Sequence, residues 1–232
     1  MSDVLRVQWT IIPQRAPQPW LRCSRCGEAR AFRSSGKIRV NANGKRVDAW
    51  LIYRCTSCHS TWNRPILERR HVRAIDRQFL TSLQSNEPRL VRRLAFDVGE
   101  LKRRSERVEE FDDARVIRNV LSAAIAPARW LEILCAVPEP TGLRVDRLLA
   151  SELGVSRSWI RRLEETAALA MLPQGVRLRQ PVRDGMRFVV GLAAAGDSIA
   201  LGACLQSQAG RDPAGARKDE VEAEEDSEDI EA

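Results

Sequence analysis

Apolar residues recur at helical spacing most clearly between residues 143 and 165. The first set falls at i, i+3, i+4 and i+8, on one side of a helix: Val145, Leu148, Leu149 and Leu153. Gly154 can end this helix in the left-handed conformation, and the Ser156 hydroxyl can cap the next helix. The second apolar set comprises Trp159, Ile160, Leu163 and Ala167. The pattern therefore predicts two short helices joined by a tight turn.

The helical period also appears in the middle of the chain. It predicts three amphipathic segments, marked by Val72, Ile75, Phe79 and Leu83, by Leu90, Val91, Leu94, Val98 and Leu101, and by Val116, Ile117, Val120, Leu121 and Ala124. Pro88 suits the first turn of the second segment. We expect the arginines on their polar sides to be solvated: Arg92, Arg93, Arg103 and Arg104.

Other stretches carry strand patterns. Residues 7–12 form a short apolar run ahead of several prolines, and residues 37–40 and 47–53 flank an Asn43-Gly44 turn that is typical of a hairpin. The apolar run 130–137 lies between two prolines and favours a buried strand. Short apolar segments follow the helical pair at 168–171, 176–178 and 186–190, which predicts a small sheet there.

Two Cys-x-x-Cys pairs carry the strongest chemical signal. Cys23-Ser-Arg-Cys26 and Cys55-Thr-Ser-Cys58 are separated by 28 residues. Four thiolates arranged as a tetrahedron suit one structural Zn²⁺ ion, so the spacing predicts a zinc ribbon. An iron–sulfur site or a thiol redox pair remains an alternative, and His59 could replace one cysteine as a ligand. The remaining cysteines, Cys135 and Cys204, lie in apolar surroundings and are expected to be inert thiols.

These elements together predict an α+β protein of four segments. We expect the β-rich zinc ribbon over 1–66, a helical connector over 67–126 and an α+β module over 127–205. Residues 206–232 are rich in Ala, Gly, Pro and acids and lack aromatic residues, so they predict a disordered acidic tail.

Charge is unevenly distributed along the chain. The net charge is +7, but residues 211–232 hold ten of the thirty-one acids and only three of the thirty-eight bases. The rest of the chain therefore carries +14, which favours a polyanion such as nucleic acid as the partner. The alternative is an arginine-rich composition without a binding role.

The ribbon segment combines basic and aromatic residues. Its rings, which could stack on bases or simply fill a small core, are Trp20, Phe32, Trp50, Tyr53 and Trp62. The most apolar long run, 188–205, is interrupted by polar residues and glycines, so no membrane span is expected. The reduced-type cysteine pattern and the absence of a signal-like start predict a cytoplasmic location.

Residues 143–190 resemble the S-four-type RNA-binding domain. The resemblance is carried by Arg144-Val-Asp146 with Leu148-Leu149-Ala150, by Gly154-Val-Ser-Arg-Ser158, and by Val176, Val182 and Gly185. The sequence departs from that family at Ala167, where glycine is usual, and at Leu172-Pro173, where Asn-Gly is usual.

This resemblance implies an arginine-rich face that contacts the phosphates of structured RNA. The arginines that it assigns to the face are Arg144, Arg157, Arg161, Arg162, Arg177 and Arg179. It further suggests that Asp146 pairs locally with an arginine. Recognition would follow RNA shape rather than base sequence, because Arg–phosphate bonds read no bases.

Residues 4–190 also resemble a bacterial family of unassigned function, domain of unknown function 1062. The resembling residues include Trp9-Thr-Ile-Ile-Pro13, the segments 39–46 and 50–55, and Thr61-Trp-Asn63. This resemblance implies that the ribbon and the RNA-binding module occur together, and it brings no known reaction.

The sequence thus favours a non-enzymatic protein that binds structured rRNA or tRNA, with the ribosome as one candidate partner, and that contains one structural zinc ion. Only two histidines are present, and neither a phosphate-binding glycine loop nor a nucleophile elbow appears. The alternatives are a DNA-binding or transcription-associated ribbon protein and an RNA-modifying enzyme or its accessory.

Overall fold

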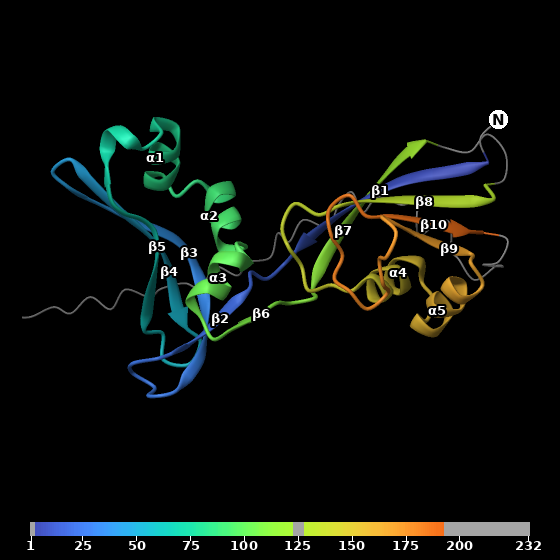
Figure 1. The fold of residues 1–232 in the computed structure, drawn as a ribbon, viewed down its shortest axis with the longest axis horizontal. Coiled ribbons are helices and arrows are strands. Elements are labelled where there is room, and N and C mark those ends of the chain that lie inside the picture. The colour runs from blue at the N-terminus through green and yellow to red at the C-terminus, as the bar shows by residue number, and fades with distance from the viewer. Residues whose placement is uncertain (1–2, 123–127, 193–232) are drawn as a thin grey trace, which may run out of the picture.

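The computed structural model describes residues 3–122 and 128–192. These residues form two lobes connected by a narrow waist (Figure 1). We call residues 18–109 the cysteine lobe, and residues 3–13 together with 114–122 and 128–192 the arginine lobe. The predicted acidic tail, Ala124 and Cys204 lie outside the described residues. No described helix is both long and apolar enough to cross a membrane.

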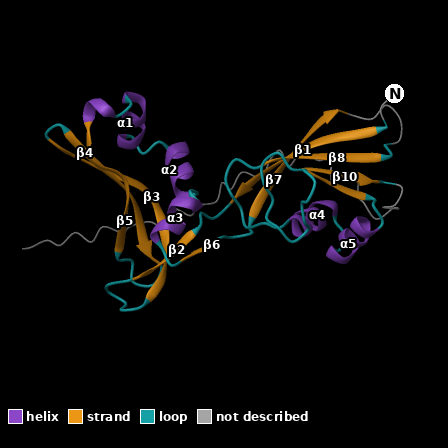
Figure 2. Cartoon of the chain, viewed as in Figure 1, coloured by secondary structure: helices purple, strands orange, loops and turns teal. Residues whose placement is uncertain are grey.

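The cysteine lobe is a five-stranded sheet with three short helices. Its strands are β2 (Gln18–Arg22), β3 (Ala29–Asn43), β4 (Arg46–Cys55), β5 (Thr61–His71) and β6 (Arg107–Glu109), in the order β5-β4-β3-β2-β6. A 3-10 turn, η1 (Val72–Ala74), leads to α1 (Arg77–Gln84), α2 (Pro88–Ala95) and α3 (Val98–Arg104). The helices lie on one side of the strands (Figure 2). They cover the buried side chains Ala49, Leu51 and Tyr53 of β4.

The arginine lobe is a second five-stranded sheet with two helices. Its strands are β1 (Val4–Pro13), β7 (Ala114–Ser122), β8 (Trp130–Ala136), β9 (Leu169–Leu172) and β10 (Arg187–Gly191), in the order β7-β1-β8-β10-β9. The helices are α4 (Val145–Leu153) and α5 (Arg157–Glu165). Alternate strand residues such as Trp9 and Ile133 are fully buried, as are Leu149 and Ile160 of the helices. The described chain is thus mixed α+β, with two sheets and five α-helices.

The cysteine lobe is inserted into the arginine lobe. Strand β1 pairs in parallel with β8 and antiparallel with β7, so both β1 and β7 belong to the arginine-lobe sheet. The chain leaves this lobe after Pro13, forms the cysteine lobe, and returns at Ala114. The two sheets therefore do not follow the segment boundaries 1–66 and 67–126 expected from the sequence.

The prediction of a third helix in the central segment is wrong. Residues 114–122 form β7, in which Val116 pairs with Ile11 and Val120 pairs with Val7. The segment is short and rich in β-branched residues, and pairing with a strand far away in the sequence decides its conformation.

The second predicted amphipathic segment forms two helices, α2 and α3. Helix α2 ends at Ala95 with Phe96 as its C-cap, and the Asp97 carboxylate accepts a hydrogen bond from Glu100 N–H at 2.9 Å to begin α3. Both helices still bury the expected apolar side chains, among them Leu90, Val91 and Leu101.

The predicted helical pair and hairpin are confirmed. Gly154 ends α4 with φ 69°, and the Ser156 hydroxyl accepts a hydrogen bond from Trp159 N–H at 3.1 Å. Asn43 and Arg46 close the β3–β4 hairpin, with Gly44 at φ 57° in the turn. The predicted strand at 130–137 is β8.

Arg92 connects the two lobes. Its Nε donates to Glu139 Oε1 at 2.8 Å, and its Nη2 donates to the Pro13 carbonyl at 2.7 Å. Its guanidinium also lies 4.7 Å from the centre of the Phe96 ring. Arg103 and Arg104 instead pair with Glu100 on their own helix. The expectation that all these arginines are solvated is therefore wrong for Arg92, which forms hydrogen bonds between the two lobes.

Candidate metal site and nucleic-acid interface

The four predicted cysteine ligands lie at two turns of similar construction. Cys23 follows β2 and Cys55 ends β4. In the first turn Gly27 N–H donates to the Cys23 carbonyl at 2.9 Å, and in the second His59 N–H donates to the Cys55 carbonyl at 3.0 Å. Gly27 and His59 both have positive φ, at 77° and 61°. His59 thus occupies the position of a turn residue, and it is not part of the sulfur cluster.

The sulfur atoms are close enough to hold one metal ion. All four Sγ atoms lie within 4.8 Å of one another, with Cys23 and Cys58 at 3.5 Å and Cys26 and Cys55 at 4.0 Å. A tetrahedron with metal–sulfur bonds of about 2.3 Å has edges of about 3.8 Å. The observed separations match this size, so the four cysteines could hold a metal ion.

Hydrogen bonds around the cysteines shift the pKa values of two of the thiols in opposite directions. Hydrogen bonding from the Ser60 hydroxyl, 3.1 Å from the Cys23 Sγ atom, is the main cause that lowers the pKa of Cys23 to about 6. The neighbouring Cys58 thiol is the main cause that raises the pKa of Cys26 to about 12. Four thiolates at these distances repel one another, and a bound cation removes that obstacle.

Most of the aromatic residues predicted near the cysteines are unavailable for base stacking. Phe32 and Tyr53 are buried in the core, and burial raises the pKa of Tyr53 to about 12. Trp62 packs on Tyr53 with ring centres 5.2 Å apart. Arg107 covers the Trp20 ring, with its guanidinium carbon 4.1 Å from the ring centre. Of these five aromatic residues, Trp50 is the one that is neither buried nor in contact with a ring or guanidinium group named here.

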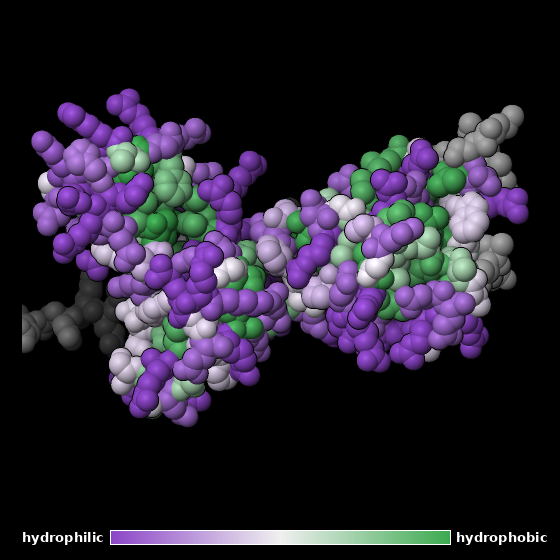
Figure 3. Space-filling model, in the orientation of Figure 1, coloured by the Kyte–Doolittle hydropathy of each residue, from purple (hydrophilic) through white to green (hydrophobic). Residues whose placement is uncertain are grey.

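Four of the six predicted arginines surround one hollow in the arginine lobe. This hollow, which we call the arginine hollow, has a volume of about 380 Å³. Its lining residues are Asp146, Arg157, Arg161, Glu164, Glu165, Arg177, Leu178 and Arg179. Hydrophilic side chains gather over α4 and α5, which carry much of this surface (Figure 3). The spacing that predicted a shared face for Arg157 and Arg161 is consistent with this placement.

The segment that carries Arg177 and Arg179 is tied to helix α4. Asp146 N–H donates to the Leu178 carbonyl at 2.9 Å, and Val145 N–H donates to the Gln180 carbonyl at 3.0 Å. The Leu178 side chain is buried, whereas the two flanking arginines are exposed. Leu178 therefore anchors the segment and leaves its two guanidinium groups at the hollow.

Arg144 and Arg162 are placed differently from the other four. Arg144 binds Asp146 with two hydrogen bonds, at 3.0 Å and 2.6 Å, which agrees with the local pairing expected for Asp146. This pair neutralises the buried Asp146 carboxylate, which is part of the lining of the hollow. Arg162 is exposed on α5 but does not line the hollow.

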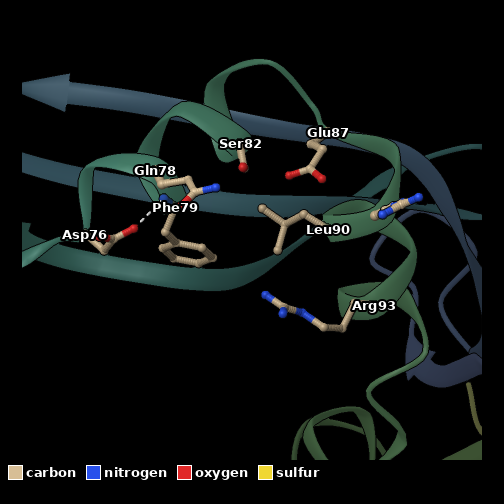
Figure 4. A pocket seen from close by; sticks show the side chains of 8 residues that line it. Asp76, Gln78, Phe79, Ser82, Glu87, Leu90 and Arg93 are labelled. Atoms are coloured by element: carbon tan, nitrogen blue, oxygen red, sulfur yellow. Dashed lines mark hydrogen bonds between the residues drawn. The ribbon is translucent and has the colours of Figure 1, made fainter. Parts of the chain in front are cut away.

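A second hollow lies between α1 and α2 and was not anticipated from the sequence. Its side chains include the cap residues Asp76 and Glu87 together with Phe79, Leu90 and Arg93 (Figure 4). Asp76 accepts a hydrogen bond from Phe79 N–H at 2.8 Å, so this carboxylate serves the helix start. Its mixture of acidic, basic and apolar groups indicates no particular ligand.

The family comparison covers parts of both candidate sites. A model described as "Protein of unknown function (DUF1062)" matches residues 40–174, which is more than half of the 232-residue chain. The chain belongs to this family. The matched region of the DUF1062 protein contains the second cysteine pair, α4 and α5, whereas Cys23, Cys26, Arg177 and Arg179 lie outside it. No curated protein and no solved structure matches the chain significantly.

Proposed function

We propose that this DUF1062 protein is a non-enzymatic RNA-binding protein that contacts structured RNA through the arginine hollow. The observation that carries the proposal is the convergence of Arg157, Arg161, Arg177 and Arg179 from two separate segments. Among the described residues, none of these four arginines has an ion-pair partner within 4.0 Å. Unpaired guanidinium groups can donate two parallel hydrogen bonds to a phosphate.

The acidic residues of the hollow limit what it binds. Asp146 is already neutralised by Arg144, so its charge opposes an anion little. Glu164 and Glu165, in the last turn of α5, bring two negative charges to the hollow, so a phosphate would contact the arginines on the sides away from these carboxylates. A site of this kind follows the course of a backbone and reads no base edges, which suits rRNA or tRNA recognised by shape.

The resemblance to the S-four-type domain supports the same proposal. Two helices precede a small antiparallel pair, β9 and β10, and the arginines of the hollow come from α5 and from the segment between these strands. Ala167, where that family usually has glycine, has φ 55°, so the backbone retains the conformation that glycine favours. Positions on the ribosome or on tRNA are the settings that this resemblance suggests.

We further propose that Cys23, Cys26, Cys55 and Cys58 hold one structural Zn²⁺ ion in a zinc ribbon. Four sulfur donors leave no open position for a substrate, so the ion would stabilise the fold rather than catalyse a reaction. The ion would connect the β2–β3 turn to the end of β4, which are otherwise joined mainly by backbone pairing.

Binding assays with three probes test the RNA proposal. The full chain should bind structured RNA more tightly than duplex DNA or single-stranded RNA at matched salt. Arg157→Glu with Arg161→Glu should weaken this binding at least tenfold without lowering the melting temperature, since both side chains are exposed. Arg73→Glu with Arg77→Glu makes the same charge change in the cysteine lobe and serves as the control.

Two results would contradict the proposal. A preference for duplex DNA would favour the transcription-associated alternative. Unchanged RNA affinity in the Arg157 and Arg161 double variant would show that the arginine hollow is not the contact surface.

A further inference from the structure

The side of the cysteine-lobe sheet that faces away from α1–α3 presents a second basic surface. Along β4 the odd-numbered residues are buried, and the even-numbered residues alternate with them on the opposite side. Directly opposed residues in an antiparallel pair share one side. Arg54 of β4 is paired with Arg33 of β3, and Trp50 is paired with Arg39. Two arginines and one tryptophan–arginine pair thus occupy the same side of the sheet.

A bulge in β3 adds a third cation beside the two opposed arginines. The pairing register shifts between Ser34 and Ile38, and Gly36 in the bulge has φ 71°. Arg33, Ser34, Ser35, Lys37 and Arg54 line one hollow of about 420 Å³, which we call the bulge hollow. Among the residues that the structure describes, no acidic side chain contributes to its lining.

Hydrogen bonds hold the bulge in this shape. The Ser35 hydroxyl donates to the Ile52 carbonyl at 2.8 Å and accepts from Lys37 N–H at 3.3 Å. On the far side of the bulge, Ile38 N–H donates to the Asn86 side chain, which comes from the turn between α1 and α2. The position of Lys37 next to Arg33 and Arg54 is therefore built into the fold.

The charge arrangement in the bulge hollow is unfavourable unless an anion joins it. Like charges directly opposite in a strand pair destabilise the pair. Among the described residues, Arg33, Lys37 and Arg54 have no ion-pair partner, although nearby Arg30 pairs with Glu28. A phosphate group shared by these cations removes the repulsion.

Trp50 extends the surface along the strand. It lies on the same side as Arg54 and four residues away, which is about 14 Å at about 3.4 Å per strand residue. Its ring is partly exposed, and its cross-strand neighbour is the exposed Arg39. Alternating cations and an aromatic ring are the combination that binds single-stranded nucleic acid, with phosphates on the cations and bases on the ring.

We infer that this side of β3 and β4 is a second RNA site, which takes a single-stranded segment of the RNA bound at the arginine hollow. The bulge hollow binds backbone phosphate, and Trp50 stacks on a base. This inference rests on the proposed function, because it assigns one RNA to both lobes.

Two hairpin RNAs test the inference, one blunt and one with a single-stranded extension of about ten nucleotides. The wild-type chain binds the extended hairpin about tenfold more tightly than the blunt one. Arg33→Glu abolishes this difference and leaves affinity for the blunt hairpin unchanged. Arg157→Glu with Arg161→Glu weakens binding of both hairpins, and Arg73→Glu with Arg77→Glu weakens neither by a comparable factor.

Arg33→Glu separates binding from folding because it places opposite charges across the strand pair. The melting temperature therefore rises or stays the same while the gain from the extension is lost. Lys37→Glu, which changes an exposed residue of the bulge, likewise abolishes the difference in affinity between the extended and the blunt hairpin. If both variants keep the wild-type gain, the inference is wrong. If the wild-type chain binds neither hairpin, the proposed function itself fails.

Discussion

Both helix ends in the arginine lobe predict that glycine is more favourable than alanine at the residue with positive φ. Gly154 has φ 69° after α4, and Ala167 has φ 55° after α5. At the second end Ala168 N–H donates to the Leu163 carbonyl at 2.9 Å, and Ala167 N–H donates to the Glu164 carbonyl at 3.1 Å. This hydrogen-bond pair is the Schellman motif, in which the residue after the cap adopts the left-handed conformation.

The expected magnitudes follow from the backbone alone. An added Cβ at Gly154 would meet no atom within 4 Å, so Gly154→Ala introduces no steric clash with the surroundings. The left-handed conformation costs an L-residue about 1–2 kcal/mol, and alanine recovers about 0.4–1 kcal/mol by restricting the unfolded chain. We therefore expect Gly154→Ala to destabilise the arginine lobe by about 1 kcal/mol and Ala167→Gly to stabilise it by about 0.5–1 kcal/mol.

Urea unfolding combined with amide hydrogen exchange in α4 and α5 measures both effects in the correct lobe. Gly99→Ala provides the control, because Gly99 lies inside α3 without positive φ and its new Cβ would have only an ordinary contact at 3.6 Å. That substitution should stabilise α3, in contrast to the same change at Gly154. If Ala167→Gly lowers stability, or if Gly154→Ala leaves it unchanged, the backbone account of these helix ends is wrong.

Two further predictions concern the metal site and the waist. Removing metal with a chelator, or replacing Cys26 by serine, should abolish exchange protection around residues 20–64 while β8 amides stay protected, because the proposed zinc ion would stabilise the fold around the four cysteines. Metal analysis should give one zinc per chain, and loss of protection in both lobes together would contradict separate cores. Arg92→Ala removes the hydrogen bonds to Glu139 and the Pro13 carbonyl. X-ray scattering should then show a wider range of lobe separations, with little change in the exchange protection of either lobe. An unchanged scattering profile would show that the other contacts between the lobes are enough to fix their separation.

Local signals predicted the parts of the fold that local interactions decide. The helical pair has a regular apolar period, a glycine after the first helix and a serine cap before the second, and all three agree with α4 and α5. The β3–β4 hairpin likewise follows from its turn residues. The cysteine cluster was predictable because the spacing within each pair sets the turn.

Non-local pairing explains what the sequence did not predict. The apolar spacing of the β7 residues is that of an amphipathic helix, and only their pairing with β1, about a hundred residues earlier in the sequence, makes them a strand. The bulge hollow depends on register in the same way. Continuing the pairing of the hairpin turn would place Arg54 opposite Ser35, whereas the bulge moves it opposite Arg33. The role of Arg92 required a relative placement of two lobes that no local pattern contains.

The insertion of one lobe into the other has a consequence for RNA binding. The two chain segments that connect the lobes and the Arg92 hydrogen bonds fix the cysteine lobe to the arginine lobe. The two segments are also paired with each other, because Gln14 N–H donates to the Asp113 carbonyl at 3.0 Å. When two sites on one protein bind one RNA, the second contact is intramolecular, and its strength depends on how well the spacing is maintained. Arg92→Ala should therefore weaken binding of the extended hairpin more than binding of the blunt hairpin, although Arg92 lines neither basic hollow. Equal loss for the two hairpins would indicate that the lobes bind RNA independently.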